Sequence, residues 1–199
     1  MGRPRVHDEN TAAGLLAAAE RLLQERGAAA LSLREVAAGA GTSTQAIYSL
    51  FGSKEALLGA LGTHAMELLH AGVDAIPATD DPRHDLVEAA LMFRRFALGH
   101  PALFEVSFQR TDPAVRPRFR ARAADALAAL MRRFEPLAAA GLLGGRSVPE
   151  AMLAFHGLCE GMAVAELRGI PFGLDPERLW RAAFWALLAG FAASPFPAP

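Results

Sequence analysis

Residues 41–58 read GTSTQAIYSLFGSKEALL. Gly41 interrupts an apolar-periodic stretch, as glycines that end helices do, and Thr42 or Ser43 can cap a new helix with a side-chain hydroxyl. That helix extends only to about Leu50, which is roughly two turns. Two short helices joined by a tight turn that contains glycine are typical of the helix-turn-helix unit.

The residues before this segment supply two further helices. A first helix over residues 10–26 places its leucines on one face and ends at Gly27. A second helix begins at Ser32, which fits a capping box with Glu35. Its apolar residues follow the i, i+3, i+4, i+7 spacing of a core-facing helix: Leu33, Val36, Ala37 and Ala40.

The short helix after Gly41 has two different faces. At about 100° per residue, Ala46, Ile47 and Leu50 fall on the side that can pack on the first two helices. The opposite side carries hydroxyl, amide and phenol groups and no acidic residue: Thr44, Gln45, Tyr48 and Ser49. These groups can reach phosphate oxygens and base edges, so the face suits a DNA groove. The alternative is an ordinary solvated face.

The charge balance excludes a bulk electrostatic mode of nucleic-acid binding. The 199 residues carry a formal net charge of −1, and the first 62 residues hold six basic and six acidic side chains. DNA binding would therefore depend on few, well-placed contacts and show a modest salt dependence. The single cysteine, Cys159, permits no internal disulfide, which fits a reducing compartment.

The rest of the chain predicts helices and essentially no sheet. Apolar residues recur at helical spacing, and helix starts are marked by Asp-Pro pairs at 81, 112 and 175 and by Ser147 with Glu150. We expect an all-α protein of about nine helices. Residues 76–84 form a polar break between a small-residue N-terminal part and an aromatic-rich C-terminal part.

Bulky apolar side chains are spread over several of the C-terminal helices. They form either a plain hydrophobic core or a pocket for an apolar ligand with few polar groups. His156 is the polar side chain among them that would contact a ligand. The ordinary interpretation of such a histidine is a hydrogen-bonded residue of the core. The candidate ligand-binding residues are Phe93, Phe96, Phe104, Phe108, Met131, Phe155, His156, Cys159 and Met162.

Two C-terminal helices are apolar over more of their circumference than a lone surface helix. The last one, RLWRAAFWALLAGFAA at 178–193, is too short to span a bilayer. The helix over 149–169 carries Gly157 and Gly161, which allow a neighbouring helix to approach closely. We expect both helices to be buried against a second subunit.

These segments together closely resemble the DNA-binding motif of the TetR (tetracycline repressor) family of transcriptional regulators. The resemblance rests on LSLREVA at 31–37, on the turn AG-x-S, on Tyr48 with Phe51, and on SKEALL at 53–58. It covers roughly residues 9–69. Two departures are small: Thr42 stands where the family usually has an apolar residue, and Ala46 where glycine is frequent.

The resemblance implies a domain organisation. A three-helix helix-turn-helix domain would occupy residues 9–69, with the motif itself at 32–51. A helical ligand-binding and dimerisation domain would occupy 76–195, with two helices from each chain forming a four-helix dimer interface. The segment FHGLCEGMAVAELRG at 155–169 also resembles the histidine-glycine helix of one C-terminal subtype.

The resemblance implies roles for individual residues as well. Lys54, the only lysine, would donate to a phosphate from the first turn of the fourth helix. Arg3 and Arg5, in a flexible arm, would add phosphate or minor-groove contacts, unless the arm is merely a disordered tail. The implied DNA contacts are Thr42, Ser43, Thr44, Gln45, Tyr48, Ser49, Lys54, Arg3 and Arg5.

Enzymatic chemistry has little support in the sequence. His64, Glu67 and His70 share a helix, but steps of three residues spread them over about 120°, which favours a solvated face over a metal site. Cys159 beside Glu160 has no evident catalytic partner. We expect a protein that is not an enzyme and that holds no cofactor and no metal.

These observations predict a ligand-responsive DNA-binding regulator, a repressor that binds a palindromic operator as a homodimer and is released by a small apolar molecule. Its expected partners are double-stranded DNA, an unidentified small-molecule effector and a second copy of the chain, without a membrane. Because no apolar signal segment follows the first basic residues, we expect a cytoplasmic location. The alternative is a helical dimeric binding or interaction protein without operator-specific DNA binding.

Overall fold

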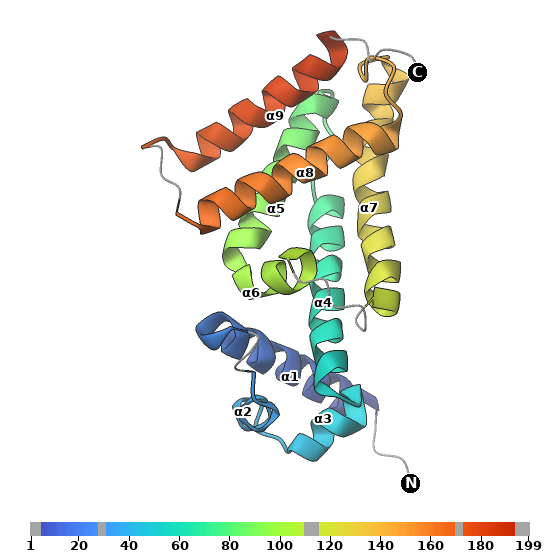
Figure 1. Ribbon diagram of the computed structural model, residues 1–199. Coiled ribbons are helices and arrows are strands. Elements are labelled where there is room, and N and C mark those ends of the chain that lie inside the picture. Colours follow the sequence, from blue (N-terminus) through green and yellow to red (C-terminus); the bar gives the residue numbers. More distant parts are fainter. Residues whose placement is uncertain (1–4, 28–30, 110–115, 170–172, 194–199) are drawn as a thin grey trace. The chain divides into compact units, whose positions relative to one another are not determined.

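The computed structural model describes residues 5–27, 31–109, 116–169 and 173–193, without the side chains of residues 5–8, 109 and 116–119. Every regular element among the described residues is helical, which confirms the all-α prediction with nine α-helices (Figure 1). These are α1 (Arg5–Arg26), α2 (Leu33–Gly39), α3 (Thr44–Phe51), α4 (Lys54–Asp74), α5 (Pro82–Gly99), α6 (Pro101–Phe104), α7 (Arg116–Ala139), α8 (Val148–Leu167) and α9 (Pro176–Ala193), with a π-helix at Glu105–Gln109 after α6.

The start of α1 differs from the sequence prediction. The helix begins at Arg5 and not at Asn10, so the prediction that Arg5 belongs to a flexible arm is wrong. Neither glycine nor proline interrupts residues 5–13, and Pro4, directly before them in the sequence, suits a helix boundary. Arg3 lies outside the described residues.

Side-chain caps start several helices as the sequence predicts. The Asp81 carboxylate accepts the backbone N–H of Arg83 and of His84 at the start of α5. The Asp175 carboxylate accepts the N–H of Glu177 at the start of α9. The Asp-Pro pair at 112 lies outside the described residues.

The capping box at α8 is complete. Ser147 N–H donates to the Glu150 carboxylate at 2.7 Å, and the Ser147 hydroxyl accepts the Glu150 N–H. Hydrogen bonds from the Ser147 hydroxyl and then from its N–H lower the pKa of Glu150. A carboxylate with a lowered pKa stabilises the fold while it is ionised, so this contribution is present at neutral pH and is lost as the pH falls through the pKa of Glu150.

The capping box predicted at α2 forms only in part. The Ser32 hydroxyl accepts the Glu35 N–H at 3.4 Å, as expected. The Glu35 carboxylate, however, pairs with Arg26 at 2.9 Å, because the end of α1 brings this guanidinium beside α2.

The described chain divides into two compact units. The first comprises residues 1–66 and 100–123, and the second comprises residues 67–99 and 124–199, within the described ranges. Both α4 and α7 are continuous helices whose residues belong partly to each unit. The domain ranges expected from the sequence, 9–69 and 76–195, do not assign α6 to the DNA-binding part, whereas the first compact unit includes it.

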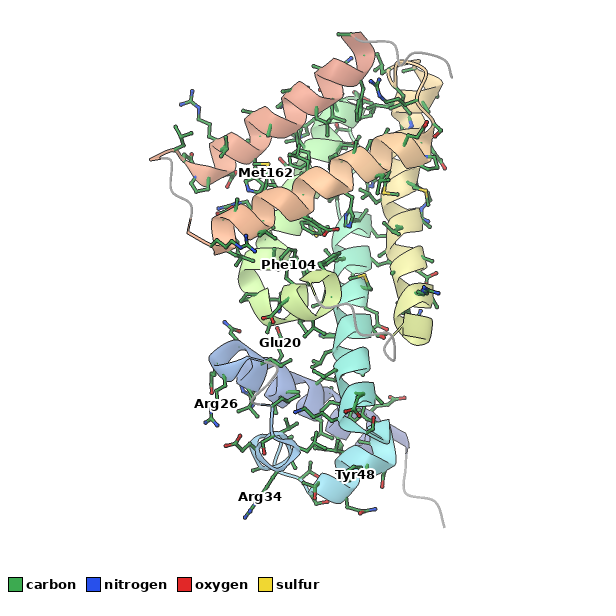
Figure 2. All side chains as sticks on the ribbon, viewed as in Figure 1. Glu20, Arg26, Arg34, Tyr48, Phe104 and Met162 are labelled. Carbon is green, nitrogen blue, oxygen red and sulfur yellow. The ribbon has the colours of Figure 1, made fainter. Side chains whose placement is uncertain are left out.

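The first unit is a small helical core closed by α6. Helix α1 packs with α2 and α3, and the buried residues Leu15 and Leu23 of α1, Val36 of α2 and Ile47 of α3 form the core. Leu57 of α4 is fully buried as well. Glu20 extends from α1 (Figure 2). Its carboxylate lies 2.7 Å from Nδ1 of His100, the N-cap residue of α6. This contact between residues distant in sequence joins α6 to α1.

The second unit is built around α5, which packs against both α8 and α9 (Figure 1). Its centre is a series of rings: Phe155 contacts Phe134 at a centroid distance of 5.5 Å and Phe184 at 4.7 Å, and Phe184 stacks on Trp180 at 5.6 Å. These four side chains are almost completely buried. Burial of these four aromatic rings makes a large stabilising contribution to the unit.

Glu166 joins three helices of the second unit by polar contacts. Its carboxylate accepts three hydrogen bonds from Arg94 of α5, at 2.6–3.2 Å, and one from the indole N–H of Trp180 at 3.0 Å. Both charged side chains are largely shielded from solvent. Hydrogen bonding to Glu166 raises the pKa of Arg94, so the guanidinium remains charged.

We predict that Glu166→Ala lowers the free energy of unfolding by about 3 kcal/mol, because it leaves Arg94 shielded from water without its carboxylate. Chemical denaturation measures the loss. Arg132→Ala is the matched control, since Arg132 pairs with Asp74 at the surface, and it should cost less than about 1 kcal/mol. The double variant Arg94→Met/Glu166→Leu should lose less free energy of unfolding than Glu166→Ala, because it leaves no unpaired charge. An equal or larger loss would show that the unpaired Arg94 is not the cause.

Candidate functional site

Helix α3 is held at both ends by its neighbours in the sequence. Ser43 is its N-cap, and the Ser43 hydroxyl accepts the backbone N–H of Ala46 at 3.4 Å. Gly52 ends the helix with a φ of +85°, and its N–H donates to the Tyr48 carbonyl. The turn before α3 also needs a glycine, since Gly41 has a φ of +64°. Of the two predicted caps, Ser43 is therefore the one observed.

The two faces of α3 are distributed as the sequence predicts. Ile47 is 0% exposed and points into the core of the first unit. Tyr48 is 52% exposed. Figure 2 shows its side chain on α3. The other members of the polar face, Thr44, Gln45 and Ser49, are exposed as well. The face is thus an accessible surface of hydroxyl, amide and phenol groups, with contact to DNA still a prediction.

The two predicted contacts at the start of α3 have local roles. The backbone N–H of Thr42 donates to the Ala37 carbonyl at 2.9 Å, which closes the turn between α2 and α3. Ser43 uses one acceptor lone pair as a cap, and its hydroxyl proton can still be donated to another acceptor. The cap role therefore does not prevent a phosphate contact by Ser43.

Lys54 has a defined partner in the structure. Its Nζ donates to the backbone carbonyl of Leu31 at 2.6 Å, and the pair is partly buried. Leu31 immediately precedes Ser32, the N-cap of α2. Sequence periodicity gives no signal for this contact, because it joins the first turn of α4 to a connection far back in the chain.

Arg34 is an exposed cation that the sequence analysis did not select. It lies in the first turn of α2 and extends away from α1 (Figure 2). Nearby arginines have protein partners instead: Arg26 pairs with Glu35, and Arg21 donates to the Gly39 carbonyl at 3.4 Å. The sequence LSLREVA could have indicated Arg34, because this residue stands two positions after the N-cap Ser32 and so belongs to the exposed first turn of α2.

The candidate ligand residues of the second unit fall into two environments. Phe155 belongs to the buried ring cluster with Phe134 and Phe184. His156 contacts the edge of Phe93 at a centroid distance of 5.6 Å and pairs with Glu160 at 2.9 Å. His156 therefore has the partners of a satisfied core histidine, while a role in ligand binding stays a prediction.

The other candidates in the second unit are also packed side chains. Phe96 lies beside Phe93 at a centroid distance of 6.4 Å, and Met131 and Met162 are half-buried. Cys159 is buried, and desolvation followed by the charge of Glu160 raises the pKa of its thiol well above the ordinary value. The thiol is therefore neutral and has no nucleophilic character at neutral pH.

The candidates in the first unit lie on the irregular segment after α5. Phe104 ends α6, and its ring contacts Phe108 of the π-helix at 5.3 Å. Between them, the buried Ser107 hydroxyl has no hydrogen-bond partner among the described residues. A π-helix is often found at functional sites, and a buried polar atom without a partner is rare in folded proteins. Sequence patterning missed Ser107 because neither property has a local sequence signal.

A cavity of about 330 Å³ lies in the second unit between the end of α4, the start of α5 and α7. Asp74, Asp85, Arg132 and Arg133 are among its lining residues, and none of the predicted ligand residues is. Its polar groups are engaged: both Asp85 carboxylate oxygens accept hydrogen bonds from Thr79, and Arg133 donates to the carbonyls of Val73 and Ile76.

The described residues contain neither a metal-ligand cluster nor a helix suited to cross a membrane. In the part of the chain that the structure describes, no three His, Cys, Asp or Glu side chains are grouped to hold a metal ion. His70, one of the residues considered for such a site, pairs with Asp74 at 2.9 Å. None of the described helices combines the length and the apolar character needed to cross a bilayer.

Two family descriptions match this chain. The one named "Bacterial regulatory proteins, tetR family" matches residues 15–61, which include α2 and α3. The one named "Tetracyclin repressor-like, C-terminal domain" matches residues 86–189, more than half of the chain. The histidine-glycine subtype expected from the sequence is not among these descriptions and stays a prediction.

A sequence relative is the HTH-type transcriptional repressor Rv3405c of Mycobacterium tuberculosis, with 36% identity over 117 residues. The match covers 56% of this chain and spans 62% of the length of the relative.

Solved structures with the same fold cover nearly the whole chain. A Rhodococcus sp. RHA1 protein of unknown function has a TM-score of 0.82 at 25% identity and covers 92% of this chain and 95% of its own. The transcriptional regulator FadR of Bacillus subtilis, solved with stearoyl-CoA, has a TM-score of 0.76 at 17% identity. The match covers 89% of this chain and 98% of the FadR chain. At the latter identity the likeness concerns the fold alone.

We predict that Ser43→Ala lowers the free energy of unfolding by about 1 kcal/mol, because the Ala46 N–H loses its cap. Urea denaturation followed by circular dichroism measures this change. Ser49→Ala, on the exposed face of the same helix, is the control and should be within about 0.5 kcal/mol of the unmodified protein. Equal losses in the two variants would contradict the cap role.

Proposed function

Because the chain belongs to the tetR family of bacterial regulatory proteins, we propose that it is a dimeric DNA-binding transcriptional regulator whose operator affinity is changed by a small molecule. The observation that carries the proposal is the exposed polar face of α3, held in one orientation by the burial of Ile47. We place its action in the cytoplasm, without a catalytic step, and as a repressor, the role named for the relative Rv3405c.

The proposed DNA contacts divide into base-reading and phosphate-binding groups. Gln45 carries an amide that can bond to a base edge in the major groove, and Tyr48 offers a hydroxyl and an apolar ring. Thr44 and Ser49 lie on the same exposed face of α3. Ser43 and Arg34 lie at the starts of α3 and α2, where backbone N–H groups also favour an anion.

The dimer is supported by apolar side chains that the single chain leaves exposed. Leu153 of α8 is 67% exposed, and Trp185 of α9 is 38% exposed. Gly157 and Gly161, on the exposed side of α8, leave room for a helix of a second copy. Large apolar side chains left exposed on two helices that pack together fit an interaction surface. A two-fold dimer would present its two α3 helices about one DNA turn apart, at roughly 34–36 Å.

The effector we propose is a small, predominantly apolar molecule. The rings of Phe104 and Phe108 in the first unit support an apolar ligand. The Ser107 hydroxyl, which has no hydrogen-bond partner among the described residues, is a group that a polar atom of the effector would complete. FadR of Bacillus subtilis, a protein of this fold, has been solved with stearoyl-CoA. The effector changes operator affinity only if it binds the two conformations of the dimer with different affinity.

We predict that the protein shifts DNA from the region upstream of its own gene and protects a palindromic sequence. In a gel-shift assay and footprint, Gln45→Ala should change which base pairs are preferred, because it removes an amide that reads base edges. Glu67→Gln, on the exposed surface of α4, is the control and should leave the preference unchanged. The absence of a shift on all genomic fragments would favour a helical interaction protein without operator-specific binding.

We predict that Leu153→Glu/Trp185→Glu converts the dimer to a monomer, because it places charges where the second copy packs. Light scattering after size-exclusion chromatography measures the molar mass. Leu98→Glu is the matched control: Leu98 is an exposed leucine of α5, outside the two helices of the proposed interface, and the variant should remain dimeric. A monomeric unmodified protein at micromolar concentration would contradict the dimer proposal.

A further inference from the structure

We propose that the cavity between α4, α5 and α7 binds a small organic monoanion, a carboxylate on a compact apolar body, and that Arg132 and Arg133 hold the carboxylate. The cavity lies within the second unit, and its lining includes none of the aromatic residues considered above for an apolar effector. The site is therefore additional to the proposed function and requires neither the operator nor the π-helical segment.

The apolar walls of the cavity are short and rigid. Its volume of about 330 Å³ is within the range of small-molecule sites. The apolar part of the lining consists of alanines and prolines: Ala78, Pro82, Ala129 and Pro136. These side chains have no rotamers through which they could swing into the space. The cavity can thus receive a compact apolar group without a rearrangement of its walls.

Arg133 is anchored at the cavity by only part of its guanidinium. Its Nη2 donates to the carbonyl of Val73 at 2.8 Å and to that of Ile76, at the end of α4. A guanidinium has five N–H donors, and both of these bonds come from one nitrogen. No further acceptor for Arg133 is found among the described residues. The two carbonyls therefore fix the position of the guanidinium, while the N–H groups of Nε and Nη1 remain for a ligand.

Arg132 is the weakly paired cation of the cavity. Its side chain is 55% exposed, and its Nη2 lies 3.4 Å from Oδ1 of Asp74. Asp74 has a closer partner in His70, whose Nε2 lies 2.9 Å from the other carboxylate oxygen. Arg132 can therefore turn two N–H groups toward a carboxylate in the cavity at little cost. Guanidinium and carboxylate groups suit each other, because they form two parallel charge-assisted hydrogen bonds.

The acceptors of the cavity are already used, and this determines the sign of the ligand. Asp85 is 6% exposed, and its two oxygens accept the N–H of Thr79 at 2.9 Å and the Thr79 hydroxyl at 2.7 Å. A cation would have to compete with these bonds, whereas an anion meets unused N–H donors. The nearby carboxylates of Asp74 and Asp85 repel a dianion more strongly than a monoanion. The lining therefore favours an organic carboxylate over a dianion such as sulfate.

The experiment titrates the full-length protein with benzoate, a carboxylate on a compact apolar ring, and follows amide signals in ¹H–¹⁵N spectra. We expect saturable shifts at Ala78, Ala129 and Arg133, which line the cavity. Benzamide has the same shape without the charge, and sulfate has charge without an apolar body. Both should bind roughly tenfold more weakly than benzoate or less, because each lacks one of the two features that the cavity recognises.

Two variants test whether benzoate occupies this cavity. Arg132→Gln removes the weakly paired charge and should weaken benzoate binding roughly tenfold, the effect of one hydrogen-bonded charge pair. Ala78→Phe fills the cavity from an exposed position and should abolish the shifts, although both arginines remain. Arg95→Gln is the matched control: it removes an exposed charge of α5 outside the cavity lining, and it should bind benzoate as the unmodified protein does.

Both test variants should fold, because Arg132 pairs at the surface and Ala78 is exposed, and their ligand-free spectra check this directly. The proposal would be overturned by the absence of saturable shifts in the unmodified protein, or by benzamide or sulfate binding as tightly as benzoate. Unchanged benzoate binding in Arg132→Gln or in Ala78→Phe would overturn it as well. The titration uses no DNA, so its outcome is independent of whether the proposed function holds.

Discussion

The helix-turn-helix of this protein depends on the burial of Ile47. Helix α3 has eight residues, and isolated helices of this length are unstable in water, so it exists because the rest of the unit holds it. Ile47 is fully enclosed, Ser43 satisfies a backbone N–H at one end, and Gly52 adopts a positive φ at the other. One anchored side chain between two fixed ends leaves the helix a single orientation. The exposed side chains of α3, Thr44, Gln45, Tyr48 and Ser49, are thereby free to differ without loss of the fold, which is what a DNA-reading surface requires.

The helices of the second unit are oriented by a different interaction, the polar contacts of Glu166. Helices α8 and α9 leave apolar residues such as Leu153 and Trp185 exposed, and an apolar surface tends to collapse onto the nearest core. The Glu166 carboxylate opposes this tendency, because its bonds to Arg94 and to Trp180 have directional geometry that a slipped helix cannot keep. The ring cluster stabilises the unit through buried apolar area, while the carboxylate adds directional bonds that join α5, α8 and α9.

The sequence predicted those features that are encoded within a few residues. The cap at Ser147, the glycine turn at Gly41 and the two faces of α3 each follow from local chemistry or from a period of about 3.6 residues. Features that depend on residues distant in sequence were missed. The bond from Lys54 to the Leu31 carbonyl and the pair of Glu20 with His100 require knowledge of which helices meet. The start of α1 was misplaced as well, since the helix begins at Arg5 and not at residue 10.

The candidate ligand residues show why an apolar pattern alone cannot distinguish a core from a pocket. Both need bulky apolar side chains at helical spacing, and they differ only in whether neighbouring side chains fill the space. At Phe155 the space is filled, because rings approach it at 4.7 and 5.5 Å and its exposed area is almost zero. A ligand there would have to displace packed rings, at the free-energy cost of disrupting a core. The segment of Phe104, Ser107 and Phe108 differs, since its backbone departs from α-helical geometry and its hydroxyl lacks a partner among the described residues. A polar group without a hydrogen-bond partner gains binding free energy when a ligand supplies one, whereas a packed ring gains none. This difference favours the π-helical segment over Phe155 as the place where an effector would bind.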